Sequence, residues 1–256
     1  MTPGTATGSV IFKDGRITLG TGTLAGGTAT FSTTSPLRVG THSITAVYTG
    51  DTDNARSTSP AVTQKVNKAS TTTSVTSNLN PSTYGQPVVL TATISVTAPG
   101  AGTPRGTVTF FDGSTKLGTA PVSRPSITVN KLTVGGHSIT AVYNGNSNFA
   151  TSTSSGITQT VNKAPTTIVL SASQNPSVSG HKVIFRAIVT PWVATGSVTF
   201  MDGTSTLGTV TISHGSARYT TSALSVGAHS ITAAYNGNTN YGTSTSAILA
   251  QTINAK

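Results

Sequence analysis

The chain has 256 residues, of which 8% are charged and 35% hydrophobic, and it contains no cysteine. Without cysteine there is no disulfide framework, no thiolate catalysis and no cysteine-ligated zinc site. The formal net charge of +10 permits attraction to polyanions, but the 15 lysines and arginines are scattered singly along the chain. This distribution favours a surface whose sparse positive charge serves solubility.

No run of about 18 apolar residues occurs, so we expect no membrane-spanning helix. Residues 1–4 have neither the basic start nor the apolar segment of a signal peptide. If the protein is secreted, we therefore expect its export signal to lie upstream of this chain.

One stretch recurs three times and divides the chain into modules. The sequence His-Ser-Ile-Thr-Ala-Val-Tyr starts at residue 42, returns at residue 137 and returns with one change at residue 229. This spacing of roughly 90 residues is too long for a solenoid repeat and suits one small β-sandwich per copy. We predict module 1 over residues 1–68, module 2 over residues 69–163 and module 3 over residues 164–256.

Module 1 begins with a segment that corresponds to the middle of the other two modules. Residues 2–8 match the loops at residues 98–106 and 191–196, which follow two predicted strands in modules 2 and 3. Module 1 is therefore predicted to lack its two opening strands.

The strand that follows this loop carries valine and phenylalanine two residues apart, which places both side chains on one face. An Asp-Gly pair ends each of these strands and predicts a hairpin, because both residues tolerate the positive φ of a tight turn. A second strand and a short third strand come next. The valine-phenylalanine pairs are Val10 with Phe12, Val108 with Phe110, and Val198 with Phe200; the turns are Asp14-Gly15, Asp112-Gly113 and Asp202-Gly203; the third strands hold Phe31, Val129 and Tyr219.

The recurring stretch itself predicts a central strand. Alternation places His42, Ile44, Ala46 and Tyr48 on one face, which we expect to be buried, with the tyrosine hydroxyl tying a corner of the sandwich. Closing strands are predicted at residues 62–66, 157–161 and 249–253, and very short linkers at residues 66–69 and 161–164.

Two opening strands are evident only in modules 2 and 3. They are predicted at residues 71–77 and 88–96 in module 2, and at residues 166–173 and 183–189 in module 3. An Asn-Pro-Ser turn between them keeps proline out of the hydrogen-bonded ladder. Each complete module thus shows about seven short strands and no helical period. The predicted fold class is all-β, with tandem Ig-like antiparallel β-sandwiches.

A family resemblance rests on three shared sequence patterns. They are Gly-Ser/Thr-Val-Thr-Phe-x-Asp-Gly, Gly-x-His-Ser-Ile-Thr-Ala-x-Tyr-x-Gly and the closing Gln-x-Val-Asn. Over nearly its whole length the chain resembles the bacterial Ig-like (Big) repeats of surface and secreted proteins. The resemblance implies an extracellular sandwich that acts as a stalk, spacer or adhesive module, with no catalytic residues. Module 1 departs from it where Asn54 replaces the aromatic of Phe149 and Tyr241.

The acidic residues are five aspartates and no glutamate. Only Asp51 and Asp53 share a loop outside the Asp-Gly turns, so we expect no two-carboxylate hydrolase and no enzyme. The same pair is a candidate calcium site, since an oxygen-rich loop can hold a hard cation. Modules 2 and 3 carry asparagines at these positions, which favours a plain turn with left-handed backbone angles.

Two other residue types recur or stand out. His42, His137 and His229 lie one in each module, so they cannot form one site, and we expect a structural role at the entrance to a strand. Trp192, the only tryptophan, lies in a predicted loop and is a candidate ligand residue that stacks on a sugar or packs against the neighbouring module. No basic cluster interleaved with aromatic residues indicates specific nucleic-acid binding.

These observations favour a non-catalytic spacer, or stalk, of a bacterial cell-surface or secreted protein, located outside the cell and without cofactors. One alternative is an adhesin-type module that binds glycans or polyanions. Another is a subunit of a self-assembling extracellular filament that uses the open edge of module 1. The expected partners are other domains of a longer surface protein, other copies of this chain, or a glycan or anionic polymer.

Overall fold

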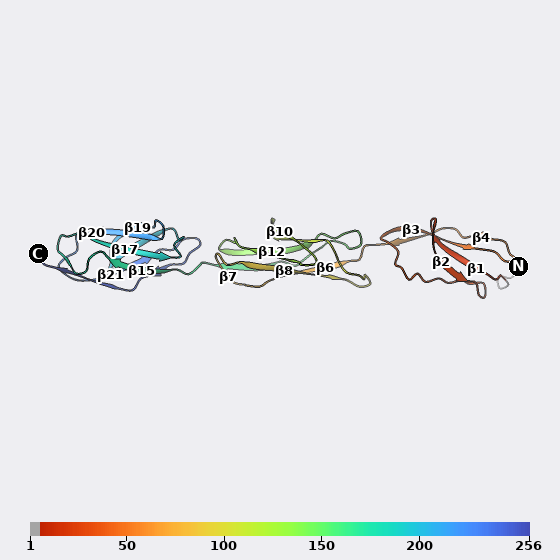
Figure 1. Cartoon of the computed structure of the whole chain (residues 1–256), viewed down its shortest axis with the longest axis horizontal. Coiled ribbons are helices and arrows are strands. Elements are labelled where there is room, and N and C mark those ends of the chain that lie inside the picture. The colour runs from red at the N-terminus through yellow and green to blue at the C-terminus, as the bar shows by residue number, and fades with distance from the viewer. Residues whose placement is uncertain (1–5) are drawn as a thin grey trace.

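The computed structural model describes residues 6–256, and this range consists of β-strands and their connections. Three groups of strands follow one another along the long axis, so that the described range begins near one end of the molecule and finishes at the other (Figure 1). In residues 6–256 no helix of a length and hydropathy suited to crossing a membrane is present. The all-β fold class is confirmed. The start of the expected loop at residues 2–8, and the stretch at residues 1–4 considered as an export signal, lie outside the described residues.

Module 2 is a sandwich of two sheets. A three-stranded sheet has the order β11-β8-β6, and a larger sheet has the order β10-β9-β12-β14-β7 with β13 paired to β12. The seven predicted strands are present, and β7 and β13 are two further strands of two residues each. The bounds are β6 Thr71–Ser77, β7 Ser82–Thr83, β8 Val88–Val96, β9 Thr107–Asp112, β10 Thr115–Pro121, β11 Ser126–Val129, β12 Gly135–Tyr143, β13 Ser152–Thr153 and β14 Ile157–Asn162.

Module 3 repeats this topology with the sheets β15-β17-β20 and β16-β23-β21-β18-β19, and β22 is paired to β21. Most pairs are antiparallel, as expected, but β7 with β14 and β16 with β23 are parallel. The Asn-Pro-Ser turn carries the chain across to the other sheet, where it runs alongside the closing strand. The bounds are β15 Thr167–Ala172, β16 Ser177–Val178, β17 Val183–Thr190, β18 Ser197–Asp202, β19 Ser205–Thr211, β20 Ser216–Thr221, β21 Gly227–Tyr235, β22 Ser244–Thr245 and β23 Leu249–Asn254.

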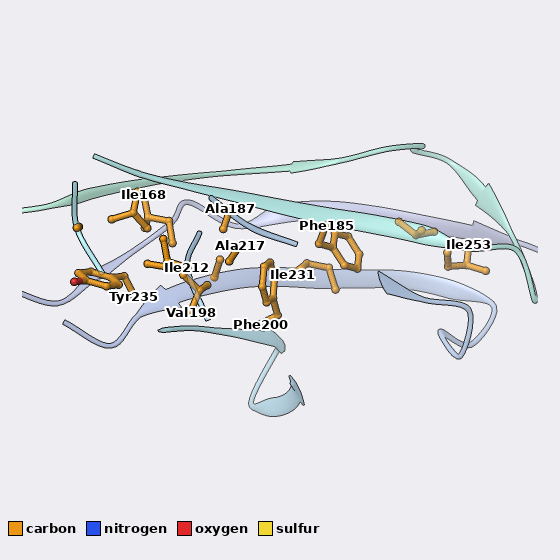
Figure 2. Packing of buried hydrophobic residues seen from close by; sticks show 14 residues of the cluster. Ile168, Phe185, Ala187, Val198, Phe200, Ile212, Ala217, Ile231, Tyr235 and Ile253 are labelled. Carbon is orange, nitrogen blue, oxygen red and sulfur yellow. The ribbon is translucent and has the colours of Figure 1, made fainter. Parts of the chain in front are cut away.

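The core of each complete module lies between its two sheets. In module 3, Phe185 and Ala187 of one sheet face Phe200 and Ile231 of the other, and all four are fully buried (Figure 2). Every second residue of each strand points into this layer, which is the packing expected for aligned sheets. The predicted inward face of the valine-phenylalanine strand and of the central strand is thus confirmed in modules 2 and 3.

Module 1 forms a single sheet in residues 6–68. Its strands have the order β2-β1-β3-β4, and β5 pairs with β3. The described part of module 1 has no second sheet, so Ile44, Ala46 and Tyr48 stay partly exposed, whereas their counterparts in module 2 are 0% exposed. The bounds are β1 Ser9–Asp14, β2 Ile17–Thr23, β3 Gly40–Tyr48, β4 Ser57–Thr58 and β5 Val62–Val66.

The predicted third strand around Phe31 is wrong. Residues 24–39 hold no named strand, although the corresponding β11 and β20 are present in modules 2 and 3. Those two strands take their hydrogen bonds from β8 and β17, and the described part of module 1 has no equivalent of either. The phenylalanine still folds over the sheet, since its ring lies against Gly20 and stacks on Phe12 with centroids 5.8 Å apart.

Candidate functional site

A histidine-aspartate pair occurs at the same place in all three modules. The histidine Nδ1 lies 2.6 to 2.7 Å from a carboxylate oxygen of the aspartate that ends the valine-phenylalanine strand. The histidine Nε2 lies 2.8 to 2.9 Å from the carbonyl oxygen of the residue four positions earlier. The three sets are His42 with Asp14 and Arg38, His137 with Asp112 and Thr133, and His229 with Asp202 and Ser225.

A carboxylate and a carbonyl oxygen both accept hydrogen bonds, so the protonated imidazolium form, which donates from both nitrogens, is the form of the ring that satisfies both partners. The hydrogen bond to the Ser225 carbonyl, together with that to the Asp202 carboxylate, raises the pKa of His229 above 6.5. In module 1 the hydrogen bond from His42 holds the pKa of Asp14 below its usual value. The pair is therefore charged and ties the first hairpin to the central strand.

This geometry corrects one sequence-based expectation. Both residues of each Asp-Gly pair were expected to tolerate the positive φ of a tight turn, and in each pair the glycine alone has positive φ. The carboxylates instead reach across to the central strand, where they also accept the amide hydrogens of Ser43 and Ser230. Since a backbone carbonyl occupies Nε2, the ring is not positioned to activate a hydroxyl nucleophile. The structural role expected for the histidines accords with these contacts.

The loop that holds Asp51 is organised by hydrogen bonds to its carboxylate. Asp51 accepts hydrogen bonds from the backbone and hydroxyl of Thr7, the backbone of Asp53, and the backbone and side chain of Asn54. The first of these, the Thr7 amide, contributes most to holding the Asp51 pKa well below its usual value. Positive φ falls on Gly50 and not on Asp51 or Asp53, so the expected left-handed angles at these aspartates are wrong.

The candidate calcium site at Asp51 and Asp53 stays a prediction. Asp53 is exposed. Within residues 6–256 no three histidine, cysteine or acidic side chains are grouped as metal ligands. A cation would have to displace the hydrogen bonds to the Asp51 carboxylate. Asn146 and Asn238 shape the corresponding loops with the same backbone hydrogen bonds to their side-chain oxygens.

The tyrosine that ends each central strand ties a corner of its sheet, as expected. Tyr48, Tyr143 and Tyr235 each donate a hydrogen bond of 2.7 Å to a backbone carbonyl in the loop before the valine-phenylalanine strand. Burial raises the pKa of all three hydroxyls. The recurring tyrosine is therefore structural.

A buried glutamine in the closing strand is a feature that the sequence analysis missed. Gln159 is 0% exposed, donates to the carbonyls of Leu79 and Thr160 and to the Ser82 hydroxyl, and accepts from Ser77. It holds the Asn-Pro-Ser turn against the second sheet. The recurrence of glutamine at positions 64, 159 and 251 is the sequence signal that could have revealed it.

The outer face of the small sheet in module 3 carries a hollow of about 220 Å³. Arg186 of β17 and Arg218 of β20 are cross-strand partners, and both are exposed and line it. Module 2 has Thr91 and Ser126 at the corresponding positions. None of the five aspartates lies on these three strands. The positive charges of Arg186 and Arg218 on this face are therefore not balanced by an acidic side chain of these strands.

Trp192 lies at one end of this face. Its backbone lies against Gly215, and the next residue, Ser216, accepts a hydrogen bond from Arg186 Nε at 3.2 Å. The tryptophan is 70% exposed, so its ring is open to solvent rather than packed against module 2.

Contacts at the two junctions between modules differ. Tyr84 of module 2 and Tyr241 of module 3 form an edge-on aromatic pair with centroids 5.7 Å apart. Lys163 Nζ adds a 2.7 Å hydrogen bond to the Asn238 carbonyl. Between modules 1 and 2 there is instead a groove of about 970 Å³, partly lined by Phe149, which takes the place of Tyr241.

These features define a tandem array of Ig-like sandwiches whose repeated polar residues hold the fold. Comparison with known proteins agrees with this class. The model of the family "Bacterial Ig-like domain (group 3)" matches residues 1–67, 75–162 and 170–254. The chain belongs to this bacterial Ig-like family, whose members are typical of surface proteins. No curated protein matches the chain.

Several solved structures share low sequence identity with the chain. The fibronectin(III)-like modules of Clostridium thermocellum CbhA are 17% identical, with 71% of this chain and 94% of that chain covered and a TM-score of 0.31. Three N-terminal domains of the outer capsid protein Hoc of bacteriophage RB49 are 11% identical, with 99% and 89% covered and a TM-score of 0.34. The ectodomain of mouse nectin-like molecule 4 is 12% identical, with 96% and 90% covered and a TM-score of 0.33. None of these likenesses bears on function.

Proposed function

We propose that this chain is a non-catalytic spacer in a bacterial surface or secreted protein, where it acts outside the cell. The observation that carries the proposal is the arrangement of the modules one after another, with module 1 and module 3 at opposite ends of the array (Figure 1). Such an array separates whatever is attached at its two ends. Its partners are other domains of a longer surface protein.

The short junction between modules 2 and 3, which restricts bending, supports this role. Four residues lie between the end of β14 at Asn162 and the start of β15 at Thr167. The Tyr84–Tyr241 pair and the Lys163 hydrogen bond span the same junction. A short linker with lateral contacts limits the angles between two domains, whereas a long flexible linker does not.

Force spectroscopy on the full chain tests the spacer function. Modules 2 and 3 are expected to unfold as two separate events of similar contour length, because each has its own core. In a second measurement, spectroscopic labels on modules 2 and 3 report the distance between the two modules. Tyr84→Ala is expected to widen the distribution of these distances and to leave the unfolding force of each module unchanged. Thr83→Ala, the partly exposed neighbour, serves as the control. A single unfolding event for both modules would contradict independent spacer units.

A second candidate function is the binding of an acidic glycan by module 3. The observation that favours it is the Arg186–Arg218 pair on a sheet face that ends at the loop of Trp192, whose ring is exposed. Guanidinium groups form paired hydrogen bonds with carboxylates or phosphates, and an indole ring stacks on a sugar face.

An array of uronate- and phosphate-bearing glycans tests this candidate. Arg186→Gln with Arg218→Gln is expected to abolish binding, and Trp192→Ala to weaken it, while Lys116→Gln with Arg124→Gln in module 2 has no effect. Binding should also weaken steeply as salt is added. An equal loss of binding in the module 2 control would show that binding depends only on the overall positive charge of the chain.

A further inference from the structure

The outer face of the small sheet in module 3 differs in chemistry from the same face in module 2. Five of the nine large hydrophobic side chains that are exposed in residues 6–256 lie on this face or in the loop at its end, and none of the nine lies in module 2. The five are Val169, Ile184, Ile188, Trp192 and Val193. The shared fold does not require them, because Ser74 and Thr93 form the cross-strand pair of module 2 where module 3 has valine and isoleucine. Grouped apolar exposure of this kind indicates a contact surface.

The hollow on this face lies where module 3 has a shorter side chain than module 2. Ser173 lines the hollow and accepts a hydrogen bond of 3.0 Å from the Ile184 amide. In module 2 the longer Asn78 stands in this place and accepts the equivalent hydrogen bond of 2.7 Å from the Val89 amide. Module 3 therefore keeps the backbone contact and leaves open the space that the larger side chain would take.

The residues around the hollow combine apolar and hydroxyl groups. Ala172 and Ile184 are apolar, and Ser171 and Ser173 carry hydroxyls. The Ser173 hydroxyl accepts the Ile184 amide hydrogen, and its own hydrogen has no acceptor in residues 6–256. The volume of about 220 Å³ is smaller than the roughly 300–1,000 Å³ of pockets that hold a drug-sized ligand. The hollow is thus sized for one substituent of a larger ligand, and it suits a substituent with a methyl group and a hydrogen-bond acceptor.

Two positive charges adjoin the hollow. Arg186 and Arg218 line it and stand directly opposite each other on neighbouring strands. Like charges in this position destabilise a sheet, and an anion bound between them removes the repulsion. Arg186 Nε donates to the Ser216 hydroxyl at 3.2 Å, which holds the side chain in place and leaves its terminal nitrogens for a ligand. The pair is therefore suited to a phosphate or carboxylate of the same ligand.

The size and charge of the face favour a saccharide over a protein. Three strands of six to eight residues, spaced about 4.8 Å apart, cover roughly 300 Å². A stable protein interface buries about 800 Å² per partner. A second copy of the chain would also bring its own net charge of +10 to a positive face. An anionic saccharide matches both the charge and the small area.

We propose that the hollow at Ser173 is an acyl subsite that takes the N-acetyl group of an anionic amino sugar, whose phosphate or carboxylate is bound by Arg186 and Arg218. The acetyl methyl group packs on Ile184, and the acetyl oxygen accepts the hydrogen of the Ser173 hydroxyl. This subsite rests on the proposed binding of an acidic glycan by module 3, and it adds which glycans are selected.

Nuclear magnetic resonance titration of the full chain with two sugar phosphates tests the proposal. N-acetylglucosamine 6-phosphate and glucose 6-phosphate carry the same anionic group and differ in the acetamido group. The acetylated sugar is expected to bind about tenfold more tightly, as one buried methyl group and one hydrogen bond predict. The amide signals that shift should be those of residues 171–173, 184–186 and 218.

A variant that fills the hollow separates the subsite from the arginine pair. Ser173→Asn copies module 2, in which Asn78 makes the same hydrogen bond to the neighbouring strand, so the fold of module 3 is kept. This variant is expected to bind the two sugar phosphates with equal affinity. The matched control, Asn78→Ser in module 2, is expected to leave the preference for the acetylated sugar unchanged.

Four results would overturn the acyl subsite. They are equal affinity of the unmodified chain for the two sugars, a preference that survives Ser173→Asn, no detectable binding of N-acetylglucosamine 6-phosphate, and binding to phosphatidylglycerol vesicles with which neither sugar phosphate competes. The last result would identify a membrane surface as the occupant. If the two sugars bind equally and Arg186→Gln with Arg218→Gln abolishes binding of both, the acidic-glycan candidate stands without the subsite.

Discussion

At the scale of single residues, the histidines are charged components of the fold. Each ring lies between a carboxylate and a carbonyl, so loss of its second proton leaves an acceptor facing an acceptor. The folded-state pKa is raised above the ordinary value of 6.5. The stabilisation is therefore fully present below pH 6.5 and is lost as the pH rises through the folded-state pKa.

We predict that modules 2 and 3 unfold at a lower temperature at pH 8.5 than at pH 6, as measured by calorimetry. Asp202→Asn is expected to flatten this dependence for module 3 alone. Two histidines that lie outside these pairs serve as controls, and His181→Gln and His214→Gln are measured at the same two pH values. A module 3 whose unfolding temperature rises between pH 6 and pH 8.5 would contradict the imidazolium assignment.

A second prediction concerns the buried glutamine of module 3. The side-chain oxygen of Gln251 is buried with no hydrogen-bond partner, because Ala172 stands where Ser77 donates to Gln159 in module 2. Ala172→Ser should supply the donor and stabilise module 3 by about 1 kcal/mol. Chemical denaturation measures the change, and Ser77→Ala should destabilise module 2 by a similar amount. No gain from the serine would mean that the oxygen is already satisfied by water.

Sequence reasoning recovered part of this residue-level detail. The tyrosine corner followed from its place at the end of a buried strand. The pairing of Asp202 with His229 did not follow, because the partners are 27 positions apart and only the register of β18 on β21 brings them together.

At the scale of elements, the same strand occurs in a covered and in an uncovered sheet. Phe200 is 0% exposed between two sheets, whereas Phe12 is only partly buried and stacks on Phe31. Removing a fully buried aromatic ring leaves a cavity as well as losing apolar contacts.

Phe200→Ala is therefore expected to destabilise module 3 by about 3–5 kcal/mol. Phe12→Ala should lower the free energy of unfolding of module 1 by clearly less, because the Phe12 ring is already partly open to water. Urea denaturation followed by amide exchange reports the two modules separately. Equal losses would indicate that the face of module 1 is covered in solution.

The strands themselves were largely predictable, because alternation of side chains with period two is a local property. The absence of a strand at Phe31 was not predictable, because a strand there would need a hydrogen-bonded partner strand that is distant in sequence. The predicted third strand in module 2 held Val129, yet the counterpart of Phe31 there is Ile127, which lies against Gly118 as Phe31 lies against Gly20. Such packing is set by the neighbouring strand and not by local pattern.

At the scale of the whole molecule, the repeats predicted three units but not how they meet. The aromatic pair between modules 2 and 3 depends on Tyr84, which lies just beyond β7 of a complete module. The described part of module 1 has no such strand, and the groove lies at its junction with module 2. The contacts that align the array thus follow from which modules have both sheets.

Small-angle scattering of the full chain tests the central claim of an extended spacer most directly. Strands of nine residues are about 30 Å long, so three sandwiches in line are roughly 90 Å or more and should give a radius of gyration near 30 Å. A compact domain of this length would have a radius of gyration of about 18 Å. A distance distribution with a long tail and a radius near 30 Å is the predicted result, and a symmetric distribution with a radius near 18 Å would contradict the account.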